Sequence, residues 1–467
     1  MTSIGSPSPF FLAGKKAYEI DRSLRFNRDD NAYLSRTPSS AGNRKTFTYS
    51  AWVKLGRTGV NSSTNPGNGL FLSCGPAGTG TNMALRITNS GYIGVDYYGI
   101  GGYYSSSILK DPSAWYHCVW VMDTTESTAA NRFRVYVNGD LIYNNQISLS
   151  QNADTPFNNN LLTTIGAYSY STSNAYRLDA YLAEVHFLDG YAYDPSYFAE
   201  TNSTTGQWIP KKYTGNYGTN GFYLNFSDNS GTTATTLGKD ESGNGNNFTP
   251  NNFSVSAGAG NDSVTDTPTN NFCTYNPLDS HSNITLSNGN LTASISSGFK
   301  LQKSTFFLQS GKWYWEITCD DVFPAGFLGI SDSTDSTNSQ GGASSSSCMI
   351  RTNNGDKRIG GSESSYGSGI SDGDVMIFAL DMDNGKFWAG KNGTFFNSGN
   401  PATGSNAATS NVTNPVTPSL GMYDNEDYTA NFGQIKMDST SYADANGHGA
   451  FKYSVPSGYF ALCSANL

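Results

Sequence analysis

The sequence has 467 residues, which is more than one typical domain needs and fits two domains with connecting material. Charged residues make up only 14% of the chain, and a net charge of −9 with a pI near 4.9 argues against a nucleic-acid-binding protein, which needs a basic surface. No run of about 18 apolar residues occurs, so the sequence predicts no membrane insertion.

The composition favours a protein of many strands and turns. Aromatic residues make up 13% of a chain that is otherwise rich in Gly, Ser, Thr and Asn. Tyr and Asn on loops suit the recognition of sugars or other surfaces, because both give adaptable hydrogen bonds. The N-terminus does not resemble a signal peptide. A recognition-type composition without an export signal fits a virus-particle protein, which is assembled in the host cytoplasm and exposed after lysis.

Residues 1–20 have no strong pattern beyond Phe10, Phe11 and Leu12, and we expect them to form an N-terminal attachment arm. From residue 23 onward, runs of aromatic and β-branched residues bounded by turn formers predict strands. Asp194 and Pro195 predict a short helical turn, with Asp as the N-cap and Pro in the first position. The strands predicted in this half lie at residues 23–27, 32–36, 47–55, 69–75, 83–98, 115–139, 162–168 and 177–189.

One hairpin pattern occurs twice, at residues 115–139 and 374–393. Each copy has an apolar strand that ends in Asp, a polar connection, an aromatic-rich strand and a closing Asn-Gly, whose residues tolerate positive φ in a tight turn. Apolar and polar residues alternate from Phe133 to Asn138, which predicts a sheet with one face on a core and one face in water. One such hairpin in each half of the chain predicts an all-β protein with two β-sandwich domains in tandem.

The first half resembles the laminin-G-like, concanavalin-A-like jelly-roll family over roughly residues 23–200. The resemblance implies a lectin-like jelly roll, which we place at residues 21–235. Most members of this family bind carbohydrate or protein. Some bind Ca²⁺, so a Ca²⁺ site is compatible with the resemblance, but no residues can be assigned to it and no cofactor is predicted. The motifs that carry the resemblance are A-W-V-K at 51–54, W-Y-H-C-V-W-V-M-D at 115–123, V-Y-V-N-G-D-L-I at 135–142 and L-A-E-V-H-F-L-D at 182–189.

From residue 201 the chain becomes rich in Asn, Gly, Thr and Ser but still contains strand-like pieces such as 221–226. Such aromatic residues are absent from fully disordered linkers, so we expect further strands of the first domain followed by an ordered connector at 236–279. Within it, residues 240–249 resemble a turn common in jelly rolls, and residues 266–272 are the expected hinge. The amino-acid sequence of this stretch is also similar to that of virion proteins of marine and freshwater tailed bacteriophages.

The second half resembles the SPRY domain, a bent β-sandwich that binds partner proteins or peptides through its loops. The resemblance implies a SPRY-like domain at residues 280–467. The Ser-rich insert at 331–347 departs from the family, and we expect it to form a long loop. The carrying motifs, in family order, are W-Y-W-E at 313–316, the Gly-Asp at 373–374, the Asn-Gly hairpin at 382–393 and N-F-G at 431–433.

Catalytic patterns are weak. A glycoside hydrolase on a jelly roll needs two carboxylates at a fixed spacing on one strand face. Asp179, Glu184 and Asp189 are five residues apart, and an odd separation puts neighbours on opposite faces of a regular strand, so we expect outward structural charges and no enzyme. The four His are too scattered for a zinc site, and no catalytic or metal-binding residues are predicted. The six Cys are also scattered, and we expect reduced, structural thiols.

Tyrosines around Gly-rich turns give the clearest binding signal, because aromatic faces stack on sugar rings or anchor protein interfaces. Alternate tyrosines can equally fill a sandwich or a contact between subunits. The candidate ligand-binding residues are Tyr97, Tyr98, Tyr103, Tyr104, Tyr168, Tyr170 and Tyr176.

Together these features predict a non-enzymatic structural protein of a tailed-phage virion, exposed on the particle as a tail fibre or adhesin. Its expected partners are other virion proteins and a host cell-surface glycan or protein. By analogy with such fibres we expect a homotrimer, although no heptad or repeat in the chain predicts one. The alternatives are a capsid or collar decoration protein, whose interfaces are all with virion proteins, and a polysaccharide-degrading enzyme.

Overall fold

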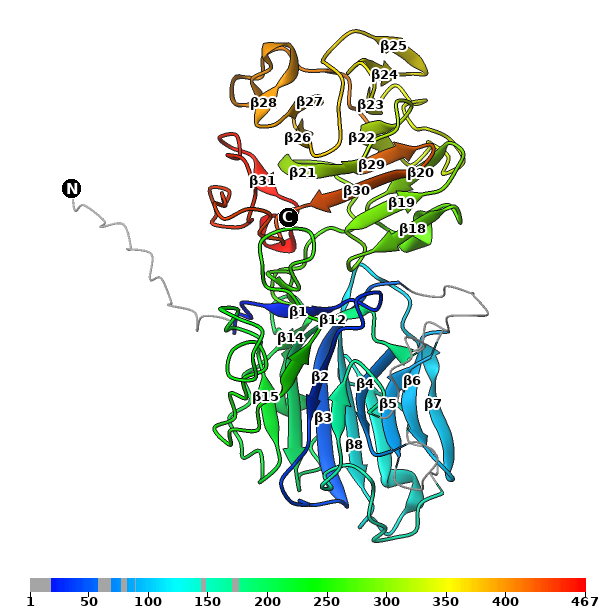
Figure 1. Cartoon of the computed structure of the whole chain (residues 1–467), viewed down its shortest axis with the longest axis vertical. Helices are drawn as coiled ribbons and strands as arrows, with labels where there is room; N and C mark the ends of the chain where they lie inside the picture. Colours follow the sequence, from blue (N-terminus) through cyan, green and yellow to red (C-terminus); the bar gives the residue numbers. More distant parts are fainter. Residues whose placement is uncertain (1–17, 58–68, 77–81, 89, 144–147, 170–175) are drawn as a thin grey trace, which may run out of the picture.

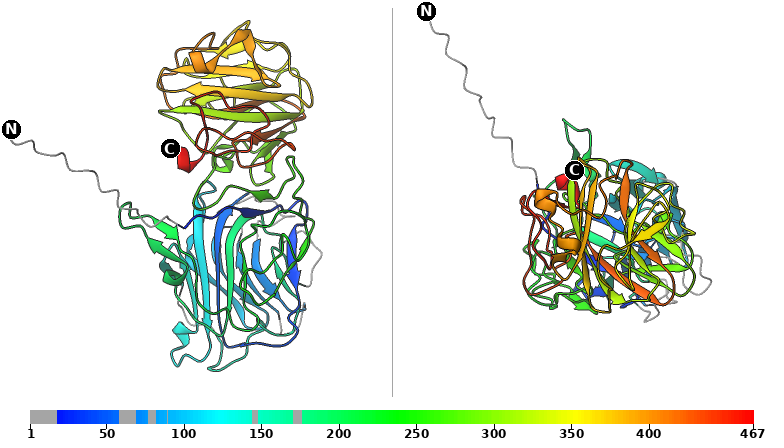
Figure 2. Two further views of the ribbon diagram at one scale, coloured as in Figure 1. Left: turned by 90° about the vertical axis from the view of Figure 1, so that its left-hand side faces the viewer. Right: turned by 90° about the horizontal axis from the view of Figure 1, so that it is seen from above.

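The computed structural model describes residues 18–57, 69–76, 82–88, 90–143, 148–169 and 176–467. These residues form two β-sandwich domains stacked end to end along the long axis of the molecule (Figures 1 and 2). The predicted all-β class with two tandem sandwiches is therefore confirmed. Helical structure in the described residues consists of short 3-10 turns, namely η1 (Ala129–Asn131), η3 (Pro195–Tyr197), η4 (Pro277–Asp279), η5 (Phe396–Ser398), η6 (Pro401–Thr403) and η7 (Ser464–Asn466).

The first sandwich packs two antiparallel sheets face to face, and within the described residues their strand orders are as follows. One sheet runs β10 (Asp140–Tyr143), β9 (Phe133–Val137), β8 (Trp115–Asp123), β3 (Thr46–Leu55), β12 (Ala180–Asp189), β1 (Ser23–Phe26) and β17 (Ser263–Val264), with β15 (Phe222–Leu224) also paired to β12. The other runs β16 (Thr249–Asn251), β2 (Tyr33–Arg36), β11 (Thr163–Ile165), β4 (Gly69–Cys74), β5 (Met83–Ile87), β6 (Tyr92–Tyr97) and β7 (Gly101–Ile108). We call them the β12 sheet and the β5 sheet.

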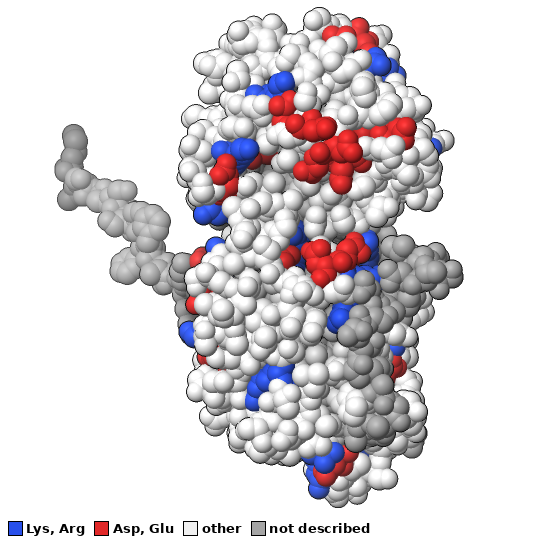
Figure 3. All heavy atoms as spheres, in the orientation of Figure 1, with Lys and Arg blue, Asp and Glu red and all other residues white. Residues whose placement is uncertain are grey.

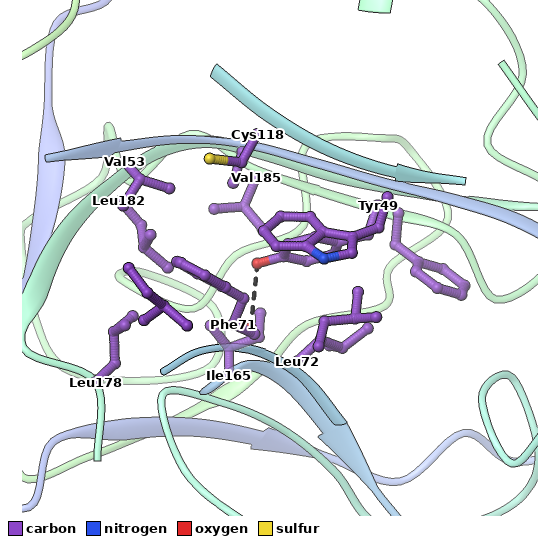
Figure 4. Packing of buried hydrophobic residues seen from close by; sticks show 14 of the residues in the cluster. Tyr49, Val53, Phe71, Leu72, Cys118, Ile165, Leu178, Leu182 and Val185 are labelled. Atoms are coloured by element: carbon purple, nitrogen blue, oxygen red, sulfur yellow. Dashed lines mark hydrogen bonds between the residues drawn. The ribbon is translucent and has the colours of Figure 1, made fainter. Parts of the chain in front are cut away.

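Alternate residues of the two sheets interdigitate to form the core of the first sandwich, part of which is seen in Figure 4. Val53, Leu182 and Val185 of the β12 sheet face Phe71 and Leu72 of the β5 sheet. Full burial of such a side chain contributes about 1.5–3 kcal/mol. The Tyr49 hydroxyl is buried too, and it donates to the Phe71 carbonyl at 3.1 Å, so its polar atom is satisfied inside the core.

Both predicted hairpins are confirmed. In the first, β8 pairs with β9 in the register Cys118↔Val137, and in the second, β26 pairs with β27 in the register Asp381↔Lys386. The closing turns adopt the expected left-handed conformations, with φ of 49° and 89° at Asn138 and Gly139 and of 51° and 83° at Asn392 and Gly393. The alternation of the second strand in the first hairpin also holds, because Phe133 and Val135 enter the core.

The segment after β12 folds back over the outer face of the β12 sheet. It begins with η3, where the Asp194 side chain accepts from the Ser196 amide at 2.8 Å, so the predicted N-cap is confirmed. A small hairpin of β13 (Ala199–Thr201) and β14 (Trp208–Pro210) follows. Aromatic residues of this segment, among them Phe198 before β13 and Trp208 in β14, cover side chains that would otherwise face water.

The stretch expected as a connector contributes strands to both sheets of the first sandwich. β16 pairs with β2, and β17 pairs with β1. Before β16, the Asp240 carboxylate accepts from the amides of Ser242 and Asn246 at 2.9 and 2.8 Å, which closes the turn that the sequence indicated. All six cysteines of the chain are free and buried.

The second sandwich also has two sheets, listed in strand order for the described residues. One runs β18 (Ile284–Ser287), β19 (Thr292–Ile295), β30 (Glu426–Asn431), β21 (Lys312–Asp321), β26 (Val375–Asp381), β27 (Lys386–Lys391) and β28 (Thr394–Phe395), with β31 (Phe460–Ala461) parallel to β21. The other runs β20 (Lys300–Lys303), β29 (Val416–Met422), β22 (Phe327–Asp332), β23 (Cys348–Arg351), β24 (Lys357–Ile359) and β25 (Ser362–Ser364). The Ser-rich insert forms the long loop between β22 and β23, as predicted.

A buried ion pair anchors the segment between the two sandwiches to the first sandwich. The Lys54 ammonium of β3 lies 2.6 Å from the Asp266 carboxylate, and both side chains are fully buried. The same ammonium donates to the Asn271 side chain and to the Phe272 carbonyl, each at 2.7 Å, so its three protons all have partners. Trp115 donates to the other Asp266 oxygen at 3.0 Å. The expected hinge at residues 266–272 is therefore wrong, because this segment is locked onto the first sandwich.

A turn of the second sandwich docks beside this ion pair. The Tyr181 ring of β12 is buried within the hydrophobic core of the second sandwich, and its hydroxyl donates to the Gly289 carbonyl at 2.7 Å. Gly289 has a φ of 64°, and a Cβ on it would lie 2.2 Å from the Tyr181 hydroxyl, so glycine is required there. Arg25 extends the contact, since it donates to the carbonyls of Asn288 and Ala259.

We expect Lys54→Met to destabilise the protein by about 3–5 kcal/mol, because it leaves the buried Asp266 carboxylate without its counterion. Denaturant unfolding of the full chain at pH 7 measures this loss. Lys239→Met is the matched control, since Lys239 pairs with Glu241 at 2.9 Å with 47% of its side chain exposed, and solvent screening makes the loss of such a pair far less costly. Equal effects of the two substitutions would contradict the proposed role of the ion pair.

Candidate functional site

The outer face of the β5 sheet brings together residues that can bind a ligand. In β5, Met83 and Leu85 point into the core, so Arg86 points outward. The register Arg86↔Gly94 and Gly94↔Tyr104 places Tyr104 of β7 in the same row, two strands away. Asp96 lies on the same face of β6. We call Arg86, Asp96, Tyr104, Tyr168 and Tyr176 the tyrosine face.

The polar groups of the tyrosine face hold one another in place. The Arg86 guanidinium forms an ion pair with one Asp96 oxygen, and the Tyr104 hydroxyl donates to the other. Gly102 makes this contact feasible, because a Cβ there would lie 2.8 Å from both the Asp96 carboxylate and the Tyr104 ring. A planar donor group and an acceptor group are thus fixed side by side on a rigid sheet, as a specific binding site requires.

Aromatic rings flank this pair. The Arg86 guanidinium lies 6.0 Å from the centre of the Tyr104 ring and 5.7 Å from that of Tyr176, within cation–π range. Tyr168 meets Tyr176 edge to face at 4.8 Å. Arg86 is 9% exposed, whereas the rings of Tyr104, Tyr168 and Tyr176 are half-buried and present part of their surface to solvent.

The electrostatics of the tyrosine face keep its groups in defined states. Burial disfavours the charge on Arg86, but the Asp96 carboxylate outweighs this effect and raises the pKa of the guanidinium. Burial and the hydrogen bond to Asp96 raise the pKa of Tyr104, so its hydroxyl stays protonated and donates at neutral pH. The face therefore offers a fixed cation, a fixed acceptor and aromatic surface.

The predicted tyrosines divide into groups. Tyr104, Tyr168 and Tyr176 meet on the tyrosine face, whereas Tyr97 and Tyr103 pack partly buried against the core. Tyr98 is 53% exposed in the turn after β6, and Tyr170 lies outside the described residues. Sequence reasoning missed Arg86 and Asp96. Each interrupts an apolar strand with a charge at an outward position, in M-A-L-R-I and Y-I-G-V-D-Y, and this alternation is the signal that could have found them.

Comparisons with known proteins agree with this architecture. The family model for the concanavalin A-like lectin/glucanases superfamily matches residues 27–195. The first sandwich is similar to these lectins. It is this lectin-like domain that carries the tyrosine face. A search of curated proteins finds no match.

Solved structures similar to the chain include two SPRY domains and a pentraxin. The SPRY domain of human HERC1 is 19% identical, with 33% of this chain and 96% of that one covered and a TM-score of 0.29. The TRIM65 PSpry domain is 16% identical, with 34% and 91% covered and a TM-score of 0.29. A pentraxin from Limulus polyphemus is 14% identical, with 42% and 94% covered and a TM-score of 0.30. The family model supports the expected concanavalin-A-like fold of the first domain, and SPRY domains are among the structural neighbours.

The three carboxylates weighed for glycoside hydrolysis lie in separate environments. Asp179 pairs with Arg57 at 2.7 Å, and Asp189 accepts from the amides of Asn43 and Asn220. Glu184 and Asp189 are only 5% and 6% exposed, so neither is the solvent-exposed charge that was expected, although Glu184 lies on the outer side of the sheet. A β-bulge between Ala183 and His186 breaks the regular alternation and turns Glu184 to the outer side of the sheet.

His117 is an example of a packed strand histidine. It is fully buried on the outer face of the β12 sheet, stacked on Trp52 at 4.9 Å and covered by Trp208. Trp208 donates to its Nδ1 at 3.1 Å, so that nitrogen is unprotonated, and Nε2 lies 2.9 Å from the Ser50 hydroxyl. Burial, with a smaller contribution from His186, lowers the pKa of His117 to about 3.

In the described part of the chain, no group of three or more His, Cys, Asp and Glu side chains could hold a metal ion. No helix in the described residues is long and apolar enough to span a membrane. Charged residues are sparse on the face drawn in Figure 3, where acidic side chains gather on the second domain. Asp321 and Asp427, which pair across β21 and β30, are two acidic residues of this domain.

His117 predicts a fall in stability on acidification. Because its pKa is about 3 in the folded state and 6.5 ordinarily, the unfolded state takes up a proton first as the pH falls below 6.5. This costs about 3 kcal/mol of unfolding free energy between pH 7 and pH 4. We expect His117→Gln to remove that part of the pH dependence in denaturant titrations. His281→Gln, at a partly exposed turn, should leave the dependence nearly unchanged, and identical profiles for both variants would refute the assignment.

Proposed function

We propose that the chain is a non-enzymatic recognition protein of a tailed-phage virion, a tail fibre or adhesin that binds host surface glycan through the tyrosine face. The observation that carries the proposal is the prearranged Arg86–Asp96–Tyr104 network between partly exposed rings. Sugars present hydroxyl groups that both donate and accept, and apolar ring faces that stack on aromatic side chains. The face offers a complementary donor, acceptor and ring within one small area.

The engagement of Asp179 and Asp189 by other groups supports a binding role without catalysis. Glycosidases hold two carboxyl groups about 5–10 Å apart on either side of the bond to be cleaved. Here Asp179 is engaged by Arg57 and Asp189 by backbone amides, and neither contacts Glu184 in the described residues. On this proposal the ligand is held and not cut.

The rest of the proposal concerns the particle. Residues 1–20 attach the protein to other virion proteins, and the protein assembles as a homotrimer that displays its lectin-like domains to the host. The low charge and the high content of Tyr, Asn, Gly and Thr support a place on the outside of the particle. The second domain, with its SPRY-like loops, contributes protein contacts.

A decoration or collar protein is the second candidate, and one observation favours it. Exposed apolar residues lie near the edges of both sheets of the first sandwich, at Ile100 and Ile108 on or next to β7 and at Leu141 on β10, with 37–46% of each exposed. Such residues suit a contact with another subunit. If subunits cover this region and the tyrosine face beside it, the interfaces are all within the virion.

Binding of the labelled full chain to intact cells of phage-sensitive strains tests the two candidates. We expect saturable binding that blocks phage adsorption and is weakened about tenfold by Tyr176→Ala or Tyr104→Ala, since central aromatic contacts contribute about 1–2 kcal/mol each. Tyr197→Ala is the control, because Tyr197 is also an exposed tyrosine, at 44%, but lies in η3 and away from the tyrosine face. Absence of binding by a folded oligomer, or full binding by the Tyr176 and Tyr104 variants, would favour the decoration protein.

A further inference from the structure

A cleft lies on the opposite side of the first sandwich from the tyrosine face. It has a volume of about 370 Å³ and lies over the outer face of the β12 sheet, where β12 pairs with β15. We call it the Glu184 cleft, after the buried carboxylate in its wall, and define it by Tyr18, Glu184, Tyr213, Tyr217 and Tyr223. Its volume is within the range of about 300–1,000 Å³ that is usual for small-molecule sites.

The β-bulge of β12 places the carboxylate in this cleft. Val185 enters the core and pairs with Leu224, while Glu184 adopts a left-handed φ of 50° and turns to the outer side. His186 then lies on the same outer side, opposite Tyr223. The bulge therefore places a buried acid among aromatic side chains on the outer face. Regular alternation along the strand would have placed it on the opposite face.

Two phenols hold the carboxylate. Tyr18 donates to Glu184 Oε2 and Tyr223 donates to Oε1, each at 2.6 Å, and the two hydroxyl oxygens are 3.0 Å apart. Each carboxylate oxygen keeps acceptor capacity for a further donor. Burial and the charge of Glu184 raise the pKa of both tyrosines, so the phenols remain donors and are not poised as nucleophiles.

The surrounding rings and charges favour a cation. His186 stacks on Tyr223 with ring centres 4.4 Å apart, and the Tyr217 hydroxyl lies 3.0 Å from His186 Nδ1. Tyr217 and Tyr223 line the cleft beside the carboxylate, and His186 packs on Tyr223 from outside the lining. The other ionisable residues of the lining are Glu19, Asp21, Glu241 and Lys212, so acids outnumber bases. Aromatic faces next to carboxylates are the usual surroundings of an ammonium ligand.

We propose that the Glu184 cleft binds an organic ammonium group, carried by a sugar with a free amine. The ammonium donates to the open positions of the Glu184 carboxylate and lies against the tyrosine rings. Polar residues at the mouth, Asn225 and Ser227, are placed to hydrogen-bond sugar hydroxyls. A metal ion fits less well, because the carboxylate already accepts from two phenols and no group of three or more metal-binding side chains occurs in the described residues.

Calorimetric titration of the full chain with D-glucosamine tests the proposal, with N-acetyl-D-glucosamine as the neutral counterpart. We expect glucosamine to bind with a dissociation constant of about 1 mM or below and at least tenfold more tightly than the acetylated sugar. Nα-acetyl-lysine amide carries the same ammonium on a peptide and should bind more weakly than glucosamine. Equal binding of the two sugars, no binding of glucosamine, or tighter binding of the lysine derivative would each overturn the proposal.

Substitutions locate the binding in the cleft. Glu184→Gln should weaken glucosamine binding at least tenfold, and Glu200→Gln, on exposed β13, should leave it unchanged. Asp21→Asn at the exposed mouth provides a variant that does not disturb the core and should weaken binding about twofold through lost charge attraction. Tyr104→Ala on the tyrosine face should leave glucosamine binding intact, which separates this site from the proposed host-glycan site. Unchanged binding in Glu184→Gln and Asp21→Asn would place the amine elsewhere.

Discussion

The contact between the two domains depends on the burial of one ammonium group. Lys54 is fully buried, and removing such a charge from water is costly unless every proton finds an acceptor. All three acceptors come from residues 266–272, which lie between the two sandwiches. The Lys54 ammonium of β3 therefore fixes how residues 266–272 run into the second domain. The docking of Tyr181 on Gly289 follows from that course of the chain.

Local patterns in the sequence were enough to predict the sandwiches. Alternation in β8 and β9, the Asn-Gly turns at 138–139 and 392–393, and the Asp194 cap all act between residues close in the chain. The contact of Lys54 with Asp266 could not be predicted. The residues around a single Lys in an apolar strand do not indicate which distant residue will pair with it. The expected hinge was wrong for the same reason, since Thr, Asn and Pro next to a buried acid look like any flexible turn.

The candidate site was predictable in part. Tyr-rich turns pointed to β6 and β7, but strand alternation sends Tyr103 to the core side and Tyr104 outward, so only one of two neighbours serves the tyrosine face. The Glu184 cleft was hidden by a bulge, whose extra residue changes the face of every side chain after it. A count of spacings along the strand assumes a regular register and therefore misplaces Glu184.

Residues at opposite ends of the second domain close the junction between the two sandwiches. The Cys273 amide donates to the Leu462 carbonyl at 3.0 Å, and the Ser464 amide donates to the Asn271 carbonyl at 2.8 Å. During translation, residues 271–273 leave the ribosome long before 462–464 are made. The backbone groups at the junction thus await their partners while the whole second domain is synthesised. A nascent chain can therefore complete its first sandwich early, but these two backbone hydrogen bonds form only after residue 464 has been made.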